Sequence, residues 1–251
     1  GGLGPPAPMG GTGRYDYAGA DAVGAPARLR AAAGWAPDEH RAVLVPHTYQ
    51  VGDAEAYKRH ELSYKEAREP TSRKDHGLRE DAVVLACMNR PHKVAGTSFD
   101  AWVKIVKQLA HGSPSIDAQL WLYAPGSDSG NSLRTRAVAR AARILPGGEE
   151  EARDRLVFAG REDRPAHLER LRHADLALDT RAYNSHTLAA DYAWAGVPLC
   201  TALCDAEPRW ASRVGASVTL AAARHEGARG LVADDWDGAF AANALRLARD
   251  G

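Results

Sequence analysis

The chain has 251 residues, of which 45% are hydrophobic and 25% are charged, and its formal net charge at pH 7 is zero. This length and composition suit one large or two small globular domains with a sizeable core. A balanced charge gives no bulk attraction to nucleic acid or to an anionic membrane, and no apolar run is long enough to span a bilayer.

The first 80 residues are irregular, and we expect a domain boundary at their end. Residues 1–11 are rich in glycine and proline and do not begin with Met, which is typical of a linker or of a piece of a longer protein. Val43–Val45 is a predicted strand, and the highly charged segment Glu55–Arg68 is predicted to be a solvated helix. We therefore expect residues 1–80 to be the remnant of an incomplete amino-terminal lobe with a connecting segment.

From residue 81 onward, strand-like and helix-like runs alternate. Strands are predicted at Ala82–Ala86, Gln119–Tyr123, Leu156–Ala159, Leu176–Leu178, Val197–Cys200 and Leu231–Val232. Helices are predicted at Phe99–Ala110, Ser132–Ile144, Ala166–Arg172, Thr187–Trp194, Trp210–Ala216 and Trp236–Arg249. Strands separated by helices indicate an α/β fold, with a Rossmann-like parallel sheet covered by helices on both faces over residues 81–251.

The polar turn between the strand that ends at Leu178 and the helix that begins at Thr187 is the most informative segment. Open α/β sheets bind ligands where such turns leave the sheet, and the first N–H groups of a helix attract anions. His186 and Thr187 add side-chain donors that suit a phosphate. Asp191 lies one helical turn further, where its carboxylate can accept hydrogen bonds from sugar hydroxyls.

Two other strand ends carry basic residues. Arg90 and Lys93 follow the strand that ends at Ala86, so both are expected at the same edge of the sheet as His186. Their two charges, beside a helix N-terminus, would suit a diphosphate. His167 and Arg170 are three residues apart on a predicted helix, share a face, and are expected to bracket a flat ring or the diphosphate.

The cysteines Cys87, Cys200 and Cys204 cannot all pair with one another. Two of them adjoin strand-like runs and no signal peptide is found, so we expect reduced, buried thiols in a cytoplasmic or nuclear protein. Cys200 and Cys204 have no partners at the spacing of metal ligands, and the sequence therefore predicts no zinc site.

Five segments, in this order, resemble the carboxyl-terminal catalytic lobe of the O-linked N-acetylglucosamine transferases: Gly10–Gly13 with Asp16 and Tyr17, Leu44–Tyr49, Asn89–Lys93, Asp179–Pro198, and Ala211–Val214. The resemblance covers nearly the whole chain, and its His-Thr and Trp-Ala-Gly blocks are specific. It implies the carboxyl-terminal, donor-binding half of a two-lobed GT-B glycosyltransferase. The implied donor is UDP-N-acetylglucosamine, the implied acceptor is Ser or Thr of a protein or peptide, and no metal, cofactor, nucleic acid or membrane is implied.

The resemblance also implies roles for individual residues. Lys93 would neutralise the leaving diphosphate, and His186 and Thr187 would contact its phosphates. Asp191 would hold the ribose. The other implied contacts are Arg164, His167 and Arg170 to the uridine, and Gly11 and Thr12 to the sugar and acceptor.

The chain departs from the family's pattern at three positions of the motifs. Arg90 stands where the family commonly has Gln, His92 stands in place of Tyr, and Leu188 replaces a second Thr. The amino-terminal lobe and the helical repeats of the family are not part of this sequence, so we expect the chain to bind a donor better than it transfers the sugar.

Two other hypotheses stay open. The related O-fucosyltransferases share the two lobes and use GDP-fucose as donor. The chain could also be a non-catalytic nucleotide-binding or interaction fragment.

Overall fold

The structure, a computed structural model, describes residues 17–20, 22–23, 41–44, 46–50, 52–126, 128–203, 210–223 and 230–250. Gly11 and Thr12, which the resemblance implies near the sugar, lie outside the described residues, as does Cys204.

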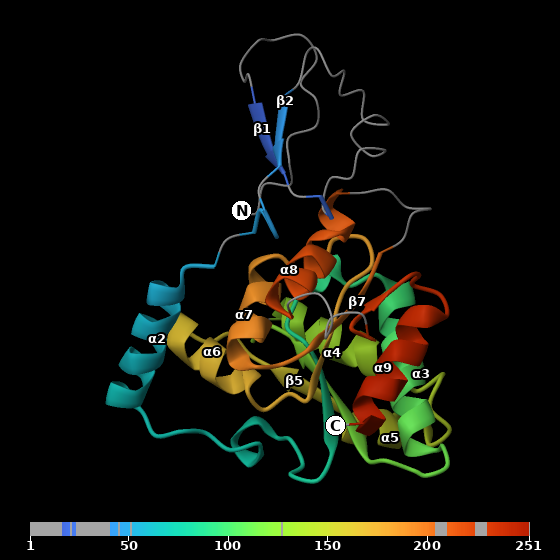
Figure 1. Ribbon diagram of the computed structural model, residues 1–251. Helices are drawn as coiled ribbons and strands as arrows, with labels where there is room; N and C mark the ends of the chain where they lie inside the picture. The colour runs from blue at the N-terminus through green and yellow to red at the C-terminus, as the bar shows by residue number, and fades with distance from the viewer. Residues whose placement is uncertain are drawn as a thin grey trace.

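A six-stranded parallel sheet organises the chain from residue 83 onward (Figure 1). Its strands are β3 (Val83–Cys87), β4 (Ala118–Tyr123), β5 (Leu156–Ala159), β6 (Leu176–Leu178), β7 (Leu199–Ala202) and β8 (Val232–Ala233). Their order across the sheet is β5-β4-β3-β6-β7-β8. The chain thus adds β4 and β5 on one side of β3. It then crosses back to place β6 on the other side of β3, and adds β7 and β8 beyond β6. The carboxyl ends of β3 and β6 therefore flank the switch point at which such sheets bind ligands.

Helices cover both faces of this sheet (Figure 1). One face carries α3 (Gly96–Ala110), α4 (Asp128–Ala141), α5 (Gly148–Arg155) and α9 (Ala239–Asp250). The other face carries α6 (Arg164–Leu171), α7 (Thr187–Ala195) and α8 (Val214–Ala222). A further helix, α2 (Ala54–Ala67), packs against α6 at the outside. The predicted Rossmann-like sheet with helices on both faces is confirmed.

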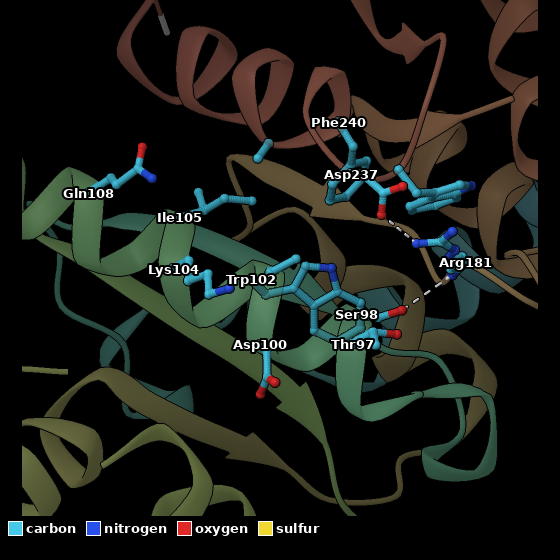
Figure 2. Close-up of a pocket in the computed structure, with 13 residues that line it drawn as sticks. Thr97, Ser98, Asp100, Trp102, Lys104, Ile105, Gln108, Arg181, Asp237 and Phe240 are labelled. Atoms are coloured by element: carbon cyan, nitrogen blue, oxygen red, sulfur yellow. Dashed lines mark hydrogen bonds and ion pairs between the residues drawn. The ribbon is translucent and has the colours of Figure 1, made fainter. Parts of the chain in front are cut away.

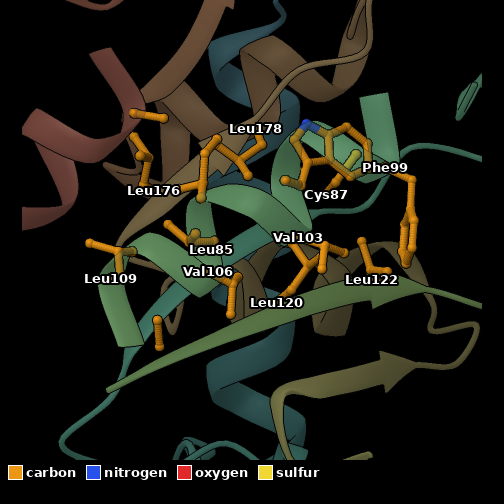
Figure 3. Close-up of a cluster of buried hydrophobic side chains, with 14 of the residues drawn as sticks. Leu85, Cys87, Phe99, Val103, Val106, Leu109, Leu120, Leu122, Leu176 and Leu178 are labelled. Atoms are coloured by element: carbon orange, nitrogen blue, oxygen red, sulfur yellow. The ribbon is translucent and has the colours of Figure 1, made fainter. Parts of the chain in front are cut away.

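The two hydrophobic clusters follow from the alternation of side chains along each strand. In β3, Leu85 and Cys87 point to the cluster under α3 and α9 (Figure 3), whereas Val84 and Ala86 point to the cluster under α7. Each fully buried aliphatic side chain of this kind stabilises the fold by roughly 1.5–3 kcal/mol. Because both faces are covered, the strands read as continuous apolar runs.

Two described residues of the first part of the chain, Val23 and Thr48, contact α8 and its N-cap residue. The carbonyl of Val23 accepts a hydrogen bond of 2.8 Å from Nε of Arg213, and the hydroxyl of Ser217 donates to that of Thr48 at 2.8 Å. The same part of the chain contains a short parallel pair of strands, β1 (Tyr17–Ala20) and β2 (Arg41–Leu44). The sequence predicted the second strand of the pair but not the first.

Three elements differ from their predictions. Helix α5 was missed because its acidic first turn, Glu149–Glu151, gives no apolar stripe and its one buried residue is Ala152. The prediction of a solvated helix near residues 55–68 was wrong in one respect, since α2 buries Tyr57 and Tyr64. The predicted helix that starts at Trp210 begins as a 3-10 turn and continues as α8.

Cys87 and Cys200 are buried free thiols, as the sequence predicted. None of the helices in the described part of the chain has the length and apolar character that a membrane span requires.

Candidate functional site

The loops that follow β3 and β6 meet at the switch point of the sheet. The loop after β3 forms a 3-10 turn, Pro91–Lys93, and the loop after β6 leads into α7. The ammonium Nζ of Lys93 donates a hydrogen bond of 3.0 Å to the backbone carbonyl of Asn184. The two loops that were predicted to share one edge of the sheet are therefore in direct contact.

Lys93, Tyr183 and His186 form a stack, which we call the Lys93 cluster. Nζ of Lys93 lies 4.1 Å from the centre of the Tyr183 ring, a cation–π geometry. Tyr183 also stacks on the imidazole of His186, with ring centres 4.7 Å apart and planes inclined by 16°. The aromatic ring thus joins the two residues that were predicted to act together. Sequence reasoning missed Tyr183, although an aromatic residue in a polar turn was a visible signal.

Lys93 and His186 of this cluster are held toward their neutral forms. His186 is 5% exposed, and burial, together with the charge of Lys93, lowers its pKa to about 4. Burial also lowers the pKa of Lys93. The imidazole is therefore neutral near pH 7, and an anion bound between these groups would favour the protonated form of each.

The N-terminus of α7 opens beside this cluster. His186 is the N-cap residue, and its side chain makes no capping hydrogen bond. Among the described residues, no acceptor is found for the N–H groups of Thr187 and Leu188, and the side chain of Thr187 is exposed. Unpaired N–H groups and the helix dipole make this a favourable place for a phosphate.

Arg90 lies at the start of the 3-10 turn that carries Lys93. Its side chain is exposed, and no hydrogen bond or ion pair of its guanidinium is found within the described residues. Its charge contributes to the lowered pKa of Lys93, so the two cations share one neighbourhood.

A second group, the Asp191 cluster, consists of Tyr57, Arg164, His167 and Asp191. The guanidinium of Arg164 donates to both carboxylate oxygens of Asp191, with 2.6 Å to Oδ2. The hydroxyl of Tyr57 donates to Oδ1 at 2.6 Å. The carboxylate is 3% exposed, so its predicted role toward a sugar hydroxyl depends on the acceptor position that these donors leave open.

His167 and Arg170 lie in contact, as their spacing on one helix predicted. Nη2 of Arg170 is 3.0 Å from Nδ1 of His167, and Nη1 donates to the carbonyl of Gly160 at 2.8 Å. Because a guanidinium only donates, Nδ1 accepts and the proton of the neutral ring sits on Nε2. That Nε2 lies 3.9 Å from Oδ2 of Asp191. Burial and the nearby charge of Arg170 lower the pKa of His167 to about 4.

The carboxylate of Asp179 holds the loop between β6 and α7 in place. This side chain is fully buried and accepts hydrogen bonds from the N–H groups of Thr180 at 2.9 Å and Ser185 at 2.7 Å. The hydroxyl of Thr201, on β7, donates to its second oxygen at 2.8 Å. Burial raises the pKa of Asp179, and the three hydrogen bonds oppose that shift. A Cβ atom on Gly215 of α8 would lie only 2.0 Å from Oδ2.

A pocket of about 370 Å³ lies elsewhere, between α3 and α9 (Figure 2). Trp102 and Phe240 line it, and an ion pair of 2.7 Å joins Arg181 and Asp237 at one side. Its lining residues include none of the residues predicted for the site. It belongs to the opposite face of the sheet from α7.

Of the predicted site residues, Lys93 and His186 thus lie in the Lys93 cluster, whereas Arg164, His167 and Asp191 lie in the Asp191 cluster. Within the part of the chain that the structure describes, no group of three His, Cys, Asp or Glu side chains could hold a metal ion. Two residues that were not predicted belong to these clusters. Tyr183 is part of the Lys93 cluster, and Tyr57 is part of the Asp191 cluster.

Comparisons with known proteins agree on one family. A model of glycosyl transferase family 41 matches residues 63–250. A probable UDP-N-acetylglucosamine–peptide N-acetylglucosaminyltransferase of Arabidopsis thaliana is 30% identical over 179 residues, which are 71% of this chain and 16% of that protein. A UDP-N-acetylglucosamine–peptide N-acetylglucosaminyltransferase of Caenorhabditis elegans is 30% identical over 131 residues, which are 52% of this chain and 10% of that protein.

Solved structures show the same fold. An O-GlcNAc transferase of Thermobaculum terrenum has a TM-score of 0.62 at 23% identity, covering 94% of this chain and 38% of that one. A UDP-forming α,α-trehalose-phosphate synthase of Burkholderia vietnamiensis has a TM-score of 0.54 at 17% identity, covering 94% of this chain and 54% of that one. These likenesses confirm the GT-B-like α/β fold.

The close approach of Gly215 to Asp179 predicts a costly substitution. Alanine ordinarily stabilises a helix by about 1 kcal/mol over glycine, but Gly215→Ala should lower the free energy of unfolding by about 1–3 kcal/mol because its methyl group would press on the buried carboxylate. Urea unfolding measures this. Gly160→Ala is the control, since a Cβ there meets no atom within 4 Å; equal stability of the two variants would contradict the prediction.

The two buried histidines predict a loss of stability in mild acid. The pKa values of His167 and His186 are about 4 in the folded chain, below their ordinary value of 6.5, so the unfolded chain binds protons that the folded chain excludes. Stability should therefore be full above about pH 6.5 and fall as the pH drops toward 4. Urea unfolding between pH 7.5 and 4.5 measures the slope of the free energy of unfolding against pH.

The slope should be shallower in His186→Gln and unchanged in His92→Gln, whose side chain is exposed. A slope that is the same in all three proteins would show that His186 does not titrate in this way.

Proposed function

The chain belongs to glycosyl transferase family 41, and we propose that it is the donor-binding lobe of a UDP-N-acetylglucosamine-dependent protein O-N-acetylglucosaminyltransferase. The chain spans 16% and 10% of the lengths of the Arabidopsis and Caenorhabditis relatives. We therefore assign donor binding to the residues of this chain, and sugar transfer to Ser or Thr of proteins to the enzyme as a whole. We expect that enzyme in the cytoplasm or nucleus.

The observation that carries the proposal is the meeting of Lys93 and His186 at the switch point of the sheet. They come from loops 93 residues apart in the chain and both contact the ring of Tyr183, next to the N-terminus of α7. A lysine ammonium, a hydroxyl and free helix N–H groups are the donors that a diphosphate requires.

In the proposed reaction, the oxygen of an acceptor Ser or Thr hydroxyl forms a bond to the anomeric carbon of the sugar and gives up its proton to the medium. The bond from that carbon to the diphosphate oxygen breaks, and negative charge develops on the departing UDP. Lys93 and the N–H groups at the start of α7 lie where they would stabilise this charge. His186, neutral near pH 7, would add one hydrogen bond. We propose that these groups take the place of a metal ion and that no cofactor is needed.

The nucleoside would occupy the Asp191 cluster. Oδ1 of Asp191 already accepts from Tyr57 and Arg164, whereas Oδ2 accepts from Arg164 alone. A ribose hydroxyl placed near Oδ2 would donate to it and accept from Nε2–H of His167, which lies 3.9 Å from that oxygen. Arg170 fixes the ring in the tautomer that this arrangement needs.

Two departures from the family's pattern act in opposite directions at the diphosphate. Leu188 removes a hydroxyl, and a lost hydrogen bond to a charged group costs about 1.5–3 kcal/mol. Arg90 adds an exposed positive charge close to Lys93. We propose that this charge offsets part of the loss.

Isothermal titration calorimetry of the 251-residue chain with UDP tests the proposal. We expect binding below millimolar concentration, and Lys93→Ala should weaken it about tenfold or more because a charge-assisted hydrogen bond is lost. Lys104→Ala is the matched control, since Lys104 is an exposed lysine on α3 at the other pocket.

Absence of UDP binding at millimolar concentration would overturn the proposed donor. Tighter binding of GDP than of UDP in the same titration would instead favour the O-fucosyltransferase hypothesis. An unchanged affinity of Lys93→Ala would remove this lysine from the site.

A further inference from the structure

Helix α2 contributes to the Asp191 cluster from a residue that precedes the match to the family model. The family match begins at residue 63, within α2, and Tyr57 lies six residues before it. The hydroxyl of Tyr57 nevertheless makes a buried hydrogen bond of 2.6 Å to Asp191, 134 residues away in the sequence. The sequence predicted a solvated helix here, so this contact needs its own explanation.

The ring of Tyr57 also contacts two side chains of neighbouring helices. It stacks on Trp194 of α7, with ring centres 5.0 Å apart and planes inclined by 17°. The guanidinium of Arg164 also lies over this ring, 5.4 Å from the ring centre. Tyr57 therefore touches both Asp191 and the arginine that pairs with it, and it does so from a third element of the fold.

Two ion pairs also link α2 and its C-cap residue to α6 and its flanking residues. They pair Arg68 with Asp163 and Arg172 with Glu61, and these side chains are 30–51% exposed. Exposed ion pairs of this kind contribute about 0–1 kcal/mol each. The buried hydrogen bond of Tyr57, by contrast, links α2 directly to the Asp191 cluster.

The position of Tyr57 decides which acceptor on Asp191 stays open. With two donors on Oδ1, the remaining lone pair lies on Oδ2, toward His167. Burial and the nearby carboxylate raise the pKa of Tyr57, so its hydroxyl stays protonated and acts as a donor. Without this donor, Oδ1 would also keep an open acceptor position, and a ribose hydroxyl could bind at either oxygen.

We propose that Tyr57 is a positioning residue for the nucleoside half of the donor, and that docking of α2 and binding of the nucleotide are coupled. The inference rests on the proposed function, because it takes the nucleoside to bind at the Asp191 cluster. By linkage, a nucleotide that binds better when α2 is docked must in turn hold α2 in place.

Calorimetry with two probes, UDP and inorganic pyrophosphate, tests the role of Tyr57. Tyr57→Phe should weaken UDP about tenfold and leave pyrophosphate unchanged, because pyrophosphate reaches only the Lys93 cluster. Lys93→Ala should weaken both probes. Tyr64→Phe is the matched control, since Tyr64 lies on the same helix, is buried, and donates to the carbonyl of Glu69 instead of the site.

An equal affinity of Tyr57→Phe and the unchanged chain for UDP would overturn the inference. Equal weakening of UDP and pyrophosphate would also overturn it, because that result marks a general loss of structure. Failure of the unchanged chain to bind UDP would overturn the proposed function and this inference with it, whereas binding of UDP without any effect of Tyr57→Phe would overturn the inference alone.

Hydrogen exchange of the unchanged chain gives a second measurement that does not depend on the folding of a variant. UDP should slow exchange of the α2 amides, and pyrophosphate should not. Exchange of α2 that is the same with and without UDP would contradict the coupling.

Discussion

The buried carboxylate of Asp179 is the interaction on which the rest of the site depends. Burying a charge is costly unless donors surround it, and here two backbone N–H groups of its own loop and the hydroxyl of Thr201 meet that requirement. These bonds fix the loop between β6 and α7 to the neighbouring strand, and α8 can approach only because Gly215 has no side chain. The position of His186 and of the start of α7 follows from this arrangement.

The two ends of the site use different chemistry to hold their groups. In the Lys93 cluster, the ring of Tyr183 contacts a cation and a neutral imidazole. A positive charge therefore lies near a helix N-terminus. The Asp191 cluster pairs a buried carboxylate with a guanidinium and directs one oxygen toward His167. Both histidines are kept neutral by burial beside cations, which lets each offer a single defined hydrogen bond near pH 7.

Much of the fold could be predicted from local patterns. The strands at residues 156–159 and 176–178 were predicted with the bounds that the structure has, because short apolar runs between helical segments are typical of a covered parallel sheet. Helix α5 was missed since a short helix held by charges carries no periodic apolar signal. Tyr57 and Tyr183 were missed because Asp191 and Lys93, the residues that they contact, lie far from them in the sequence.

The sequence by itself determined that candidate binding residues lie at strand ends. Lys93 and His186 each follow an apolar run, and parallel strands present their carboxyl ends at one edge of the sheet. Only the tertiary structure decided which strand ends are neighbours. The order that places β3 beside β6 results from packing of helices on both faces, and it brings the two loops together. Packing likewise decided which oxygen of Asp191 keeps an open acceptor position, because the docking of α2 places the hydroxyl of Tyr57 at Oδ1.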